Sequence, residues 1–223
     1  MAPNHRDGAA AVRFAVSGQI GCAVTIPRCA TEPSSDHDCP RVLTALRGML
    51  LRVAVSRQTL CYVFRSGEGG RRQVLLGRKK RGFGAGMIMG LGGKAGPGES
   101  EAACAVREAG EEAGIAVDPG SLEWRTELSF VFPVRPELDA VVTVFFGREW
   151  AGEPRESEEM APGWFDAASL PLDQMWDDEA YWLPRVMAGE ALSGVITYDD
   201  ACEMVARAEL KAVGPQAGTG KAG

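Results

Sequence analysis

The chain has 223 residues, of which 24 are Lys or Arg and 30 are Asp or Glu, and its formal net charge is −6. This length predicts one domain with extensions or two small domains. The acidic balance argues against a protein that binds nucleic-acid polymers, which needs positive charge to neutralise phosphates. The most apolar run, residues 42–55, contains Arg47 and Arg52 and is shorter than the ~20 residues of a membrane helix, which argues against a membrane-spanning protein.

Residues 1–56 differ in composition from the rest of the chain. They hold both histidines and half of the six cysteines, contain no lysine, and show no sustained helical or strand period. We expect a disordered extension or sequence upstream of a true start at Met49. Polar interruptions argue against a lipoprotein leader that ends at Cys22. Unusual ligand spacings argue against a zinc site formed by Cys22, Cys29, Cys39 and His37. The absence of a CxxC pair favours a reducing cytoplasm.

Residues 57–213 carry the pattern of a compact domain. Strands are expected at 59–64 and 73–77, joined as a hairpin by a glycine-rich turn. A loop with eight glycines spans 82–98 and precedes a helix at 99–113. Beyond the helix we expect strands near 122–132, 141–146 and 163–166, a helix near 179–188 and a last strand near 194–198. Strands around two helices predict an α+β layered fold, and residues 214–223 are expected to form a disordered tail.

The loop and helix between Gly93 and Ile115 are the most specific feature of the chain. At 100° per residue, one face of the helix is apolar (Ala102, Val106, Ala109, Ala113) and another carries three carboxylates (Glu108, Glu111, Glu112). Such carboxylates repel one another unless a cation lies among them, and oxygen ligands suit Mg²⁺ or Mn²⁺. A solvated acidic face is the alternative. The preceding glycines, which allow backbone groups to approach a metal or phosphate, and the expected left-handed cap at Gly114 favour the metal site.

This segment resembles the Nudix box, G-x5-E-x7-R-E-U-x-E-E-x-G-U, in which U is a bulky aliphatic residue. All seven fixed positions match: Gly93, Glu99, Arg107, Glu108, Glu111, Glu112 and Gly114. Ile115 fills the final U, and Ala109 is smaller than the usual residue at the other. The resemblance implies a Nudix-type α/β/α sandwich with a mixed central sheet. It also implies Mg²⁺-dependent hydrolysis, with Mn²⁺ as a substitute, of a nucleoside diphosphate linked to another group.

The resemblance further implies roles for individual residues. Glu108, Glu111 and Glu112 would bind the metal, with the Gly92 carbonyl and Glu159 as additional ligands. Arg107 would hold Glu99 and orient the carboxylates. Glu112 and Glu159 are both candidates to activate the attacking water, and the spacing does not decide between them.

Beyond the box, residues 59–198 are similar to the group of MutT homologues that hydrolyse oxidised purine nucleoside triphosphates. The similarity implies that Trp176 packs on the purine and that Asp178 and Glu179 hydrogen-bond its edge. Core packing of the tryptophan and an acidic helix N-terminus are the alternatives. The other positions that we expect to contact substrate are Thr59, Lys79, Met89, Leu91 and Phe130, of which Phe130 has core packing as its alternative.

One departure from that group concerns specificity. Ile88-Met89 stand where animal members carry Trp-Asn, whose amide is implied to bond the purine oxygen, and methionine cannot replace it. The expected activity is hydrolysis of oxidised purine nucleoside triphosphates to nucleoside monophosphate and pyrophosphate, as in 8-oxo-dGTP diphosphatases. A Nudix hydrolase for another nucleotide and an inactive nucleotide-binding sensor are the alternatives. We expect a cytoplasmic monomer that binds a small nucleotide.

Overall fold

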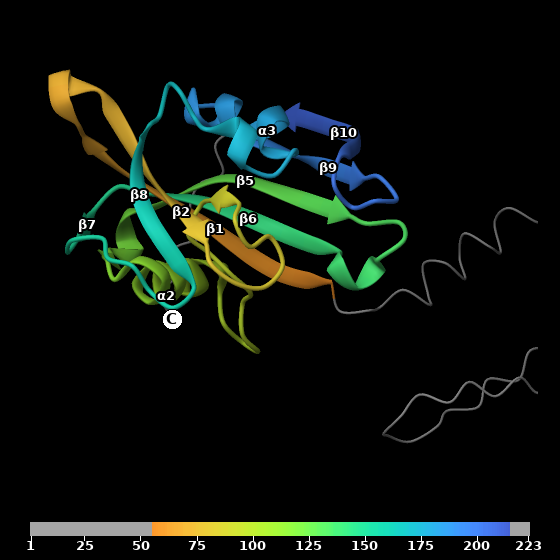
Figure 1. The fold of residues 1–223 in the computed structure, drawn as a ribbon, viewed down its shortest axis with the longest axis horizontal. Coiled ribbons are helices and arrows are strands. Elements are labelled where there is room, and N and C mark those ends of the chain that lie inside the picture. Colours follow the sequence, from red (N-terminus) through yellow and green to blue (C-terminus); the bar gives the residue numbers. More distant parts are fainter. Residues whose placement is uncertain (1–54, 215–223) are drawn as a thin grey trace, which may run out of the picture. The chain divides into compact units, whose positions relative to one another are not determined.

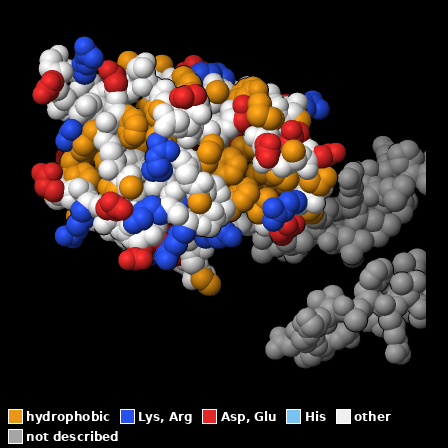
Figure 2. All heavy atoms as spheres, viewed as in Figure 1, with side chains coloured by type: hydrophobic (Ala, Val, Ile, Leu, Met, Phe, Trp, Pro, Cys, Tyr) orange, Lys and Arg blue, Asp and Glu red, His pale blue; other side chains and the backbone are white. Residues whose placement is uncertain are grey.

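The computed structural model describes residues 55–214. The extension predicted for residues 1–56 and the tail predicted for residues 214–223 therefore lie almost entirely outside the described residues. Inside this range, no helix is long and apolar enough to span a membrane. On the face shown in Figure 2, acidic and basic side chains are interspersed.

A mixed eight-stranded sheet forms the centre of the described region (Figure 1). Its order is β10 (Val205–Ala212), β9 (Leu192–Tyr198), β5 (Leu122–Val131), β6 (Ala140–Gly147), β1 (Ser56–Ser66), β2 (Arg72–Lys79) and β3 (Ile88–Met89), while β8 (Met160–Asp166) also pairs with β2. The pairs β1–β6 and β5–β9 are parallel, and the other neighbours in this sheet are antiparallel. This arrangement confirms the predicted α+β class and the predicted hairpin of the first two strands.

Two helices cover opposite faces of the sheet, α2 (Glu101–Ala113) and α3 (Glu179–Met187) (Figure 1). Because successive side chains of a strand point to opposite faces, β1 contributes to both cores. Cys61 and Val63 pack in the core that contains α2, and Tyr62 packs in the core that contains α3. The region is therefore a sandwich with one hydrophobic layer on each side of the sheet.

Helix α2 has the predicted end and a slightly later start. The Ser100 side chain accepts a hydrogen bond from the Ala103 N–H at 3.2 Å, so Ser100 is the N-cap and the helix begins at Glu101 rather than at Glu99. At the other end, Gly114 has φ of 68° in the left-handed region, which confirms the predicted C-cap. The carboxylates of the predicted acidic face are thus held on a helix with two defined ends.

Strand β10 was not predicted from the sequence. It is an edge strand, and most of its side chains are exposed, so its residues lack the run of buried apolar side chains that marks a central strand. The pair β4 (Ala116–Val117) and β7 (Trp150–Ala151) was also missed, because two residues are too few to show alternation. Short 3₁₀ turns occur at Glu68–Gly70, Pro119–Ser121, Pro136–Leu138 and Leu172–Gln174.

Candidate functional site

A cavity of about 650 Å³ lies where the beginning of β1, the ends of β2 and β5 and the start of α3 meet. This volume is in the range of small-molecule sites. Eleven of the residues singled out in the sequence line it: Thr59, Lys79, Met89, Gly92, Glu108, Glu112, Phe130, Glu159, Trp176, Asp178 and Glu179. Four others do not line it: Leu91, which is fully buried in the core beneath α2, and Glu99, Arg107 and Glu111. The fold therefore brings most of the predicted site together.

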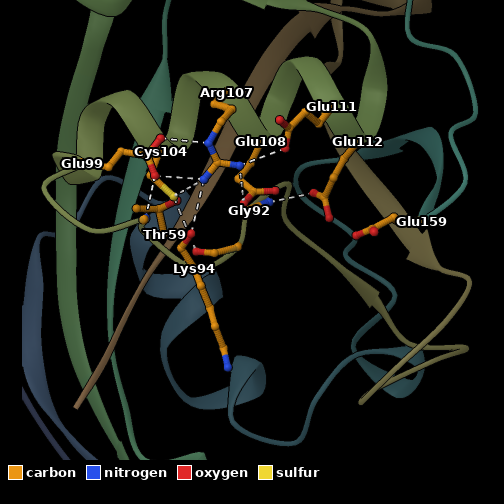
Figure 3. A network of polar contacts seen from close by, with 12 residues as sticks. Thr59, Gly92, Lys94, Glu99, Cys104, Arg107, Glu108, Glu111, Glu112 and Glu159 are labelled. Atoms are coloured by element: carbon orange, nitrogen blue, oxygen red, sulfur yellow. Dashed lines mark hydrogen bonds and ion pairs between the residues drawn. The ribbon is translucent and has the colours of Figure 1, made fainter. Parts of the chain in front are cut away.

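Arg107 connects the carboxylates of the loop and the helix (Figure 3). Its guanidinium donates two parallel hydrogen bonds to Glu99, at 2.8 and 2.9 Å, and one at 2.8 Å to each of Glu108 and Glu111. It also donates to the Lys94 carbonyl at 3.2 Å. Hydrogen bonds from Arg107 and from the Gly96 N–H lower the pKa of Glu99 to about 2. Glu99 is thus an ionised anchor for Arg107, as the resemblance implied.

Glu112 is the buried member of the acidic cluster, with 3% of its surface exposed. The Gly92 N–H donates to its Oε2 at 2.8 Å, and burial raises its pKa to about 7. Position 92 requires glycine because its Cβ would meet backbone, whereas a side chain at position 93 would displace the carboxylate of Glu108. A Cβ on Gly92 would lie 1.9 Å from the Thr59 carbonyl oxygen, and one on Gly93 would lie 2.3 Å from a Glu108 oxygen. The glycine loop therefore allows the backbone to pass directly beneath the carboxylates.

Glu159 approaches the helix from the segment before β8 and lies next to Glu112 in Figure 3. It forms an ion pair with Arg81, whose hydrogen bond lowers the pKa of Glu159. Lys79, at the end of β2, is a second positive charge that acts on both carboxylates. This corner of the cavity thus combines three acidic side chains (Glu108, Glu112 and Glu159) with two basic ones (Lys79 and Arg81).

The oxygen donors of this site suit a divalent cation, but they do not point to one common metal position. Among residues 55–214, no three His, Cys, Asp or Glu side chains converge on a common metal position. Instead Glu108 and Glu111 are hydrogen-bonded to Arg107, and the Glu111 side chain is 60% exposed. Carboxylate and carbonyl oxygens that line one cavity are nevertheless the donor chemistry that Mg²⁺ prefers. The residues present therefore fit such an ion once the carboxylates turn from Arg107.

A second part of the wall is aromatic. Trp176, in the loop before α3, has its ring centroid 4.9 Å from that of Phe83 at an interplanar angle of 31°. Tyr198 meets Trp176 edge-on, with centroids 6.5 Å apart, and stacks on Phe132 at 4.6 Å. Phe130 also lines the cavity. Flat apolar faces of this kind suit the stacking of a heterocyclic base.

Two neighbouring carboxyls are buried beside these rings. Asp178 is 5% exposed and accepts hydrogen bonds from the Trp182 indole N–H, at 2.7 Å, and from the Tyr198 hydroxyl. Glu179 is 3% exposed, and its Oε2 is sealed from solvent without a hydrogen-bond partner among the described residues. Burial raises the pKa of Asp178 and raises that of Glu179 well above its usual value. Both carboxyls therefore line the cavity, and Oε2 of Glu179 has no hydrogen-bond donor among the described residues.

The pKa of Glu179 predicts a pH-dependent stability. The folded protein keeps the proton over a pH range in which the unfolded chain, with a pKa of ~4.3, has lost it. The stabilisation is therefore complete below about pH 4 and declines as the pH rises toward the folded-state pKa, by up to ~1.4 kcal/mol per pH unit. Glu179→Gln is expected to remove this decline.

Urea unfolding at about pH 5 and about pH 8 measures this effect. Glu127→Gln, on an exposed position of β5, removes the same charge and serves as the control. An equal decline in wild type and Glu179→Gln would contradict the prediction.

Several cavity residues were not singled out as site residues from the sequence. Tyr198 stands at the end of a strand, Phe83 lies between two glycines, and Arg81 belongs to a run of basic residues. An aromatic or basic residue in such a context is usually structural or solvated, so sequence spacing alone carries no signal for them. Their position depends on which strand ends and loops meet in space.

A family model, two vertebrate proteins and a bacterial crystal structure are all similar to this chain. Residues 56–186 match the NUDIX domain family. The oxidized purine nucleoside triphosphate hydrolase of Mus musculus is 41% identical over 129 residues, which cover 58% of this chain and 81% of the mouse protein. The protein of the same name from Danio rerio is 41% identical over 126 residues, 56% of this chain and 79% of its own. The crystal structure of the mutator MutT protein from Bacillus halodurans superposes with a TM-score of 0.58 at 25% identity, covering 70% of this chain and 97% of that one.

Proposed function

The chain belongs to the NUDIX family, and on that premise we propose that it hydrolyses oxidised purine nucleoside triphosphates to a nucleoside monophosphate and pyrophosphate. The proposal is carried by one observation. A single cavity has the acidic helix α2 in one part of its wall and an aromatic ring with two buried carboxyls in another. The first part suits a diphosphate with its cation, and the second suits a purine. Both vertebrate relatives carry the name of this activity.

We propose that the metal is Mg²⁺, with Mn²⁺ as a substitute. Glu108, Glu112, Glu159 and the Gly92 carbonyl would hold it, and Glu111 would join them after leaving Arg107. Bound there, the ion would offset charge that develops on the phosphate oxygens and make the attacking water more acidic. Arg107 remains anchored to Glu99 in this arrangement and keeps the end of the glycine loop against the helix.

Glu112 is the carboxylate best placed to orient and deprotonate water. The Gly92 N–H fixes one of its oxygens, and the side chain lines the cavity. Glu159 is exposed and held by Arg81, so its position depends on a flexible surface pair. A buried, fixed carboxylate loses less freedom in the transition state than an exposed one, which favours Glu112.

The base would lie against Trp176, with Asp178 and Glu179 at its edge. Asp178 is a hydrogen-bond acceptor, and a protonated Glu179 is a donor, so together they match a purine edge that carries both kinds of group. Phe130 and Phe132 close the apolar side of the cavity. Tryptophan thus supplies stacking while the carboxyls supply selectivity.

We further propose that the protein works in the cytoplasm as a monomer, on a small nucleotide. The proposal for a monomer is supported by the cavity, whose acidic side and aromatic side are both built from the same chain. Size-exclusion chromatography with light scattering tests the monomer directly. A stable dimer would contradict this part of the proposal.

A panel of nucleotides tests the function. With Mg²⁺ present, the rates for 8-oxo-dGTP, dGTP, a methylated purine triphosphate and a sugar nucleotide are compared. Preference for the oxidised purine supports the proposal. Equal turnover of dGTP and 8-oxo-dGTP would contradict it, and turnover of none of them, with binding retained, would identify a nucleotide-binding sensor.

Met89 favours one second candidate, a purine nucleotide other than 8-oxo-dGTP. Its thioether lines the cavity from β3, where it cannot donate a hydrogen bond to a purine oxygen. Met89→Asn is therefore expected to raise kcat/KM for 8-oxo-dGTP about tenfold, expressed as the ratio of variant to wild type, which is the worth of one hydrogen bond. Met87→Asn, two residues earlier and outside the cavity wall, is the matched control. An unchanged ratio in Met89→Asn would count against the specificity argument.

A further inference from the structure

Tyr198 is held on three sides at the wall of the cavity. Its ring stacks on Phe132, with centroids 4.6 Å apart and an interplanar angle of 14°. The same ring stands perpendicular to Trp176 at 6.5 Å, and its hydroxyl donates a hydrogen bond to Oδ1 of Asp178. The side chain is almost fully buried. Its hydroxyl therefore has one fixed direction, toward the carboxyl pair.

The two carboxyls receive unequal support. Asp178 accepts two hydrogen bonds, from Tyr198 on β9 and from the indole of Trp182 on α3, one on each oxygen. Glu179 accepts none on its sealed oxygen. Two adjacent buried carboxyls do not both ionise readily, because each charge disfavours the other and neither is well solvated. Donors aimed at one member stabilise its ionised form and leave the proton on its neighbour.

The other ionisable groups around the pair do not reverse this order. Asp177, in the same turn, adds negative charge near Asp178, and its own carboxylate accepts a hydrogen bond from the Val205 N–H. Tyr62, which faces the pair from β1, has a buried hydroxyl without a partner among the described residues, and burial raises its pKa. Tyr62 is thus neutral and makes no hydrogen bond to either carboxyl.

We propose that Tyr198 is a positioning residue for substrate specificity: its hydroxyl holds Asp178 as the ionised acceptor and thereby leaves Glu179 as the protonated donor. The inference rests on the proposed function, because the donor and acceptor are expected to meet the edge of a purine base. Tyr198 touches no reacting phosphate group and acts through Asp178. It decides which pattern of hydrogen-bonding groups the cavity presents.

Tyr198→Phe tests this, because it removes the hydroxyl and keeps the ring stacked on Phe132 and edge-on to Trp176. Loss of this hydrogen bond is expected to raise the apparent pKa of Asp178, the ionised member of the pair, by about one unit. This corresponds to a tenfold change in its acid dissociation constant. Carbon-13 NMR titration of the Asp178 and Glu179 carboxyls in the free protein measures it. In turnover, KM for the oxidised purine substrate at neutral pH is expected to rise about tenfold, with kcat within twofold.

Tyr62→Phe is the matched control, since it removes a buried hydroxyl from the same core without removing a hydrogen bond to Asp178. It is expected to leave the carboxyl titration and KM unchanged. If Tyr198→Phe titrates as the wild type does, or if both variants shift equally, the proposal is overturned. The titration needs no substrate, so a protein that hydrolyses no purine nucleotide would refute the proposed function while the role of Tyr198 is still decided.

Discussion

Glu112→Gln is expected to lower kcat about 1000-fold, within the range that a general base or a metal ligand supplies. The amide keeps the size of the side chain and its hydrogen bond from the Gly92 N–H, so the fold is preserved. It removes the negative charge and the proton acceptor at the one carboxylate of helix α2 that is buried, and this side chain lines the cavity. Steady-state kinetics at saturating Mg²⁺ measure the loss.

Glu111→Gln is the comparison that makes this result specific. Glu111 is adjacent in sequence and carries the same charge, but its side chain is 60% exposed and lies outside the cavity wall. Its loss is expected to lower kcat about tenfold or less, because the exposed Glu111 is the last proposed ligand to join the metal and the four other proposed ligands stay in place. Equal losses in the two variants would show that burial does not distinguish their roles.

Helical periodicity predicts the difference in exposure between Glu112 and Glu111. Around a helix, Glu112 lies about 60° from Ala109, whereas Glu111 lies about 160° from it. Ala109 is fully buried against the sheet, so Glu112 sits at the border of the buried face and Glu111 points to solvent. The three carboxylates of the predicted acidic face therefore differ in burial.

The parts of the fold that were predictable are those defined by neighbours along the chain. The spacing from Gly93 to Gly114 indicated the loop, the helix and its cap, because capping and helical periodicity act over a few residues. Strand β10 and the short pair β4–β7 were not predictable, since exposed or two-residue strands acquire their pairing from the rest of the sheet. The same applies to Tyr198, which reaches Asp178 only through the parallel pairing of β9 with β5.

Leu91 was expected to contact the substrate, but the structure places its side chain in the core. It lies between Gly90 and Gly92, of which Gly92 lines the cavity, and similarity placed it at the substrate. The backbone there is bonded to β1, with the Cys61 N–H donating to the Leu91 carbonyl at 2.6 Å, and the side chain consequently points into the core beneath α2. Alternation along an extended segment, rather than proximity in sequence, decides which side chains reach a cavity.

Trp176→Ala is expected to raise KM for a purine nucleoside triphosphate about 10- to 100-fold and to leave kcat within about twofold. Stacking of a base on an aromatic ring is worth ~1–3 kcal/mol, and this interaction is made equally in the bound substrate and in the transition state. Trp176 packs against Phe83 and Tyr198, whereas the α2 carboxylates proposed to act on the phosphates are hydrogen-bonded to Gly92 and Arg107, so the chemical step is expected to keep its surroundings. Steady-state kinetics separate the two parameters.

Trp164→Ala is the control for loss of a large aromatic side chain, because Trp164 packs against Trp150 and Arg65 away from the cavity. It should lower stability and leave KM unchanged. The double variant Glu112→Gln/Trp176→Ala then tests whether the two parts of the site are independent. If one part performs hydrolysis and the other only holds the base, the separate losses in kcat/KM multiply. A double variant no worse than Glu112→Gln alone would mean that Trp176 contributes nothing to binding once hydrolysis is lost, which the stacking argument excludes.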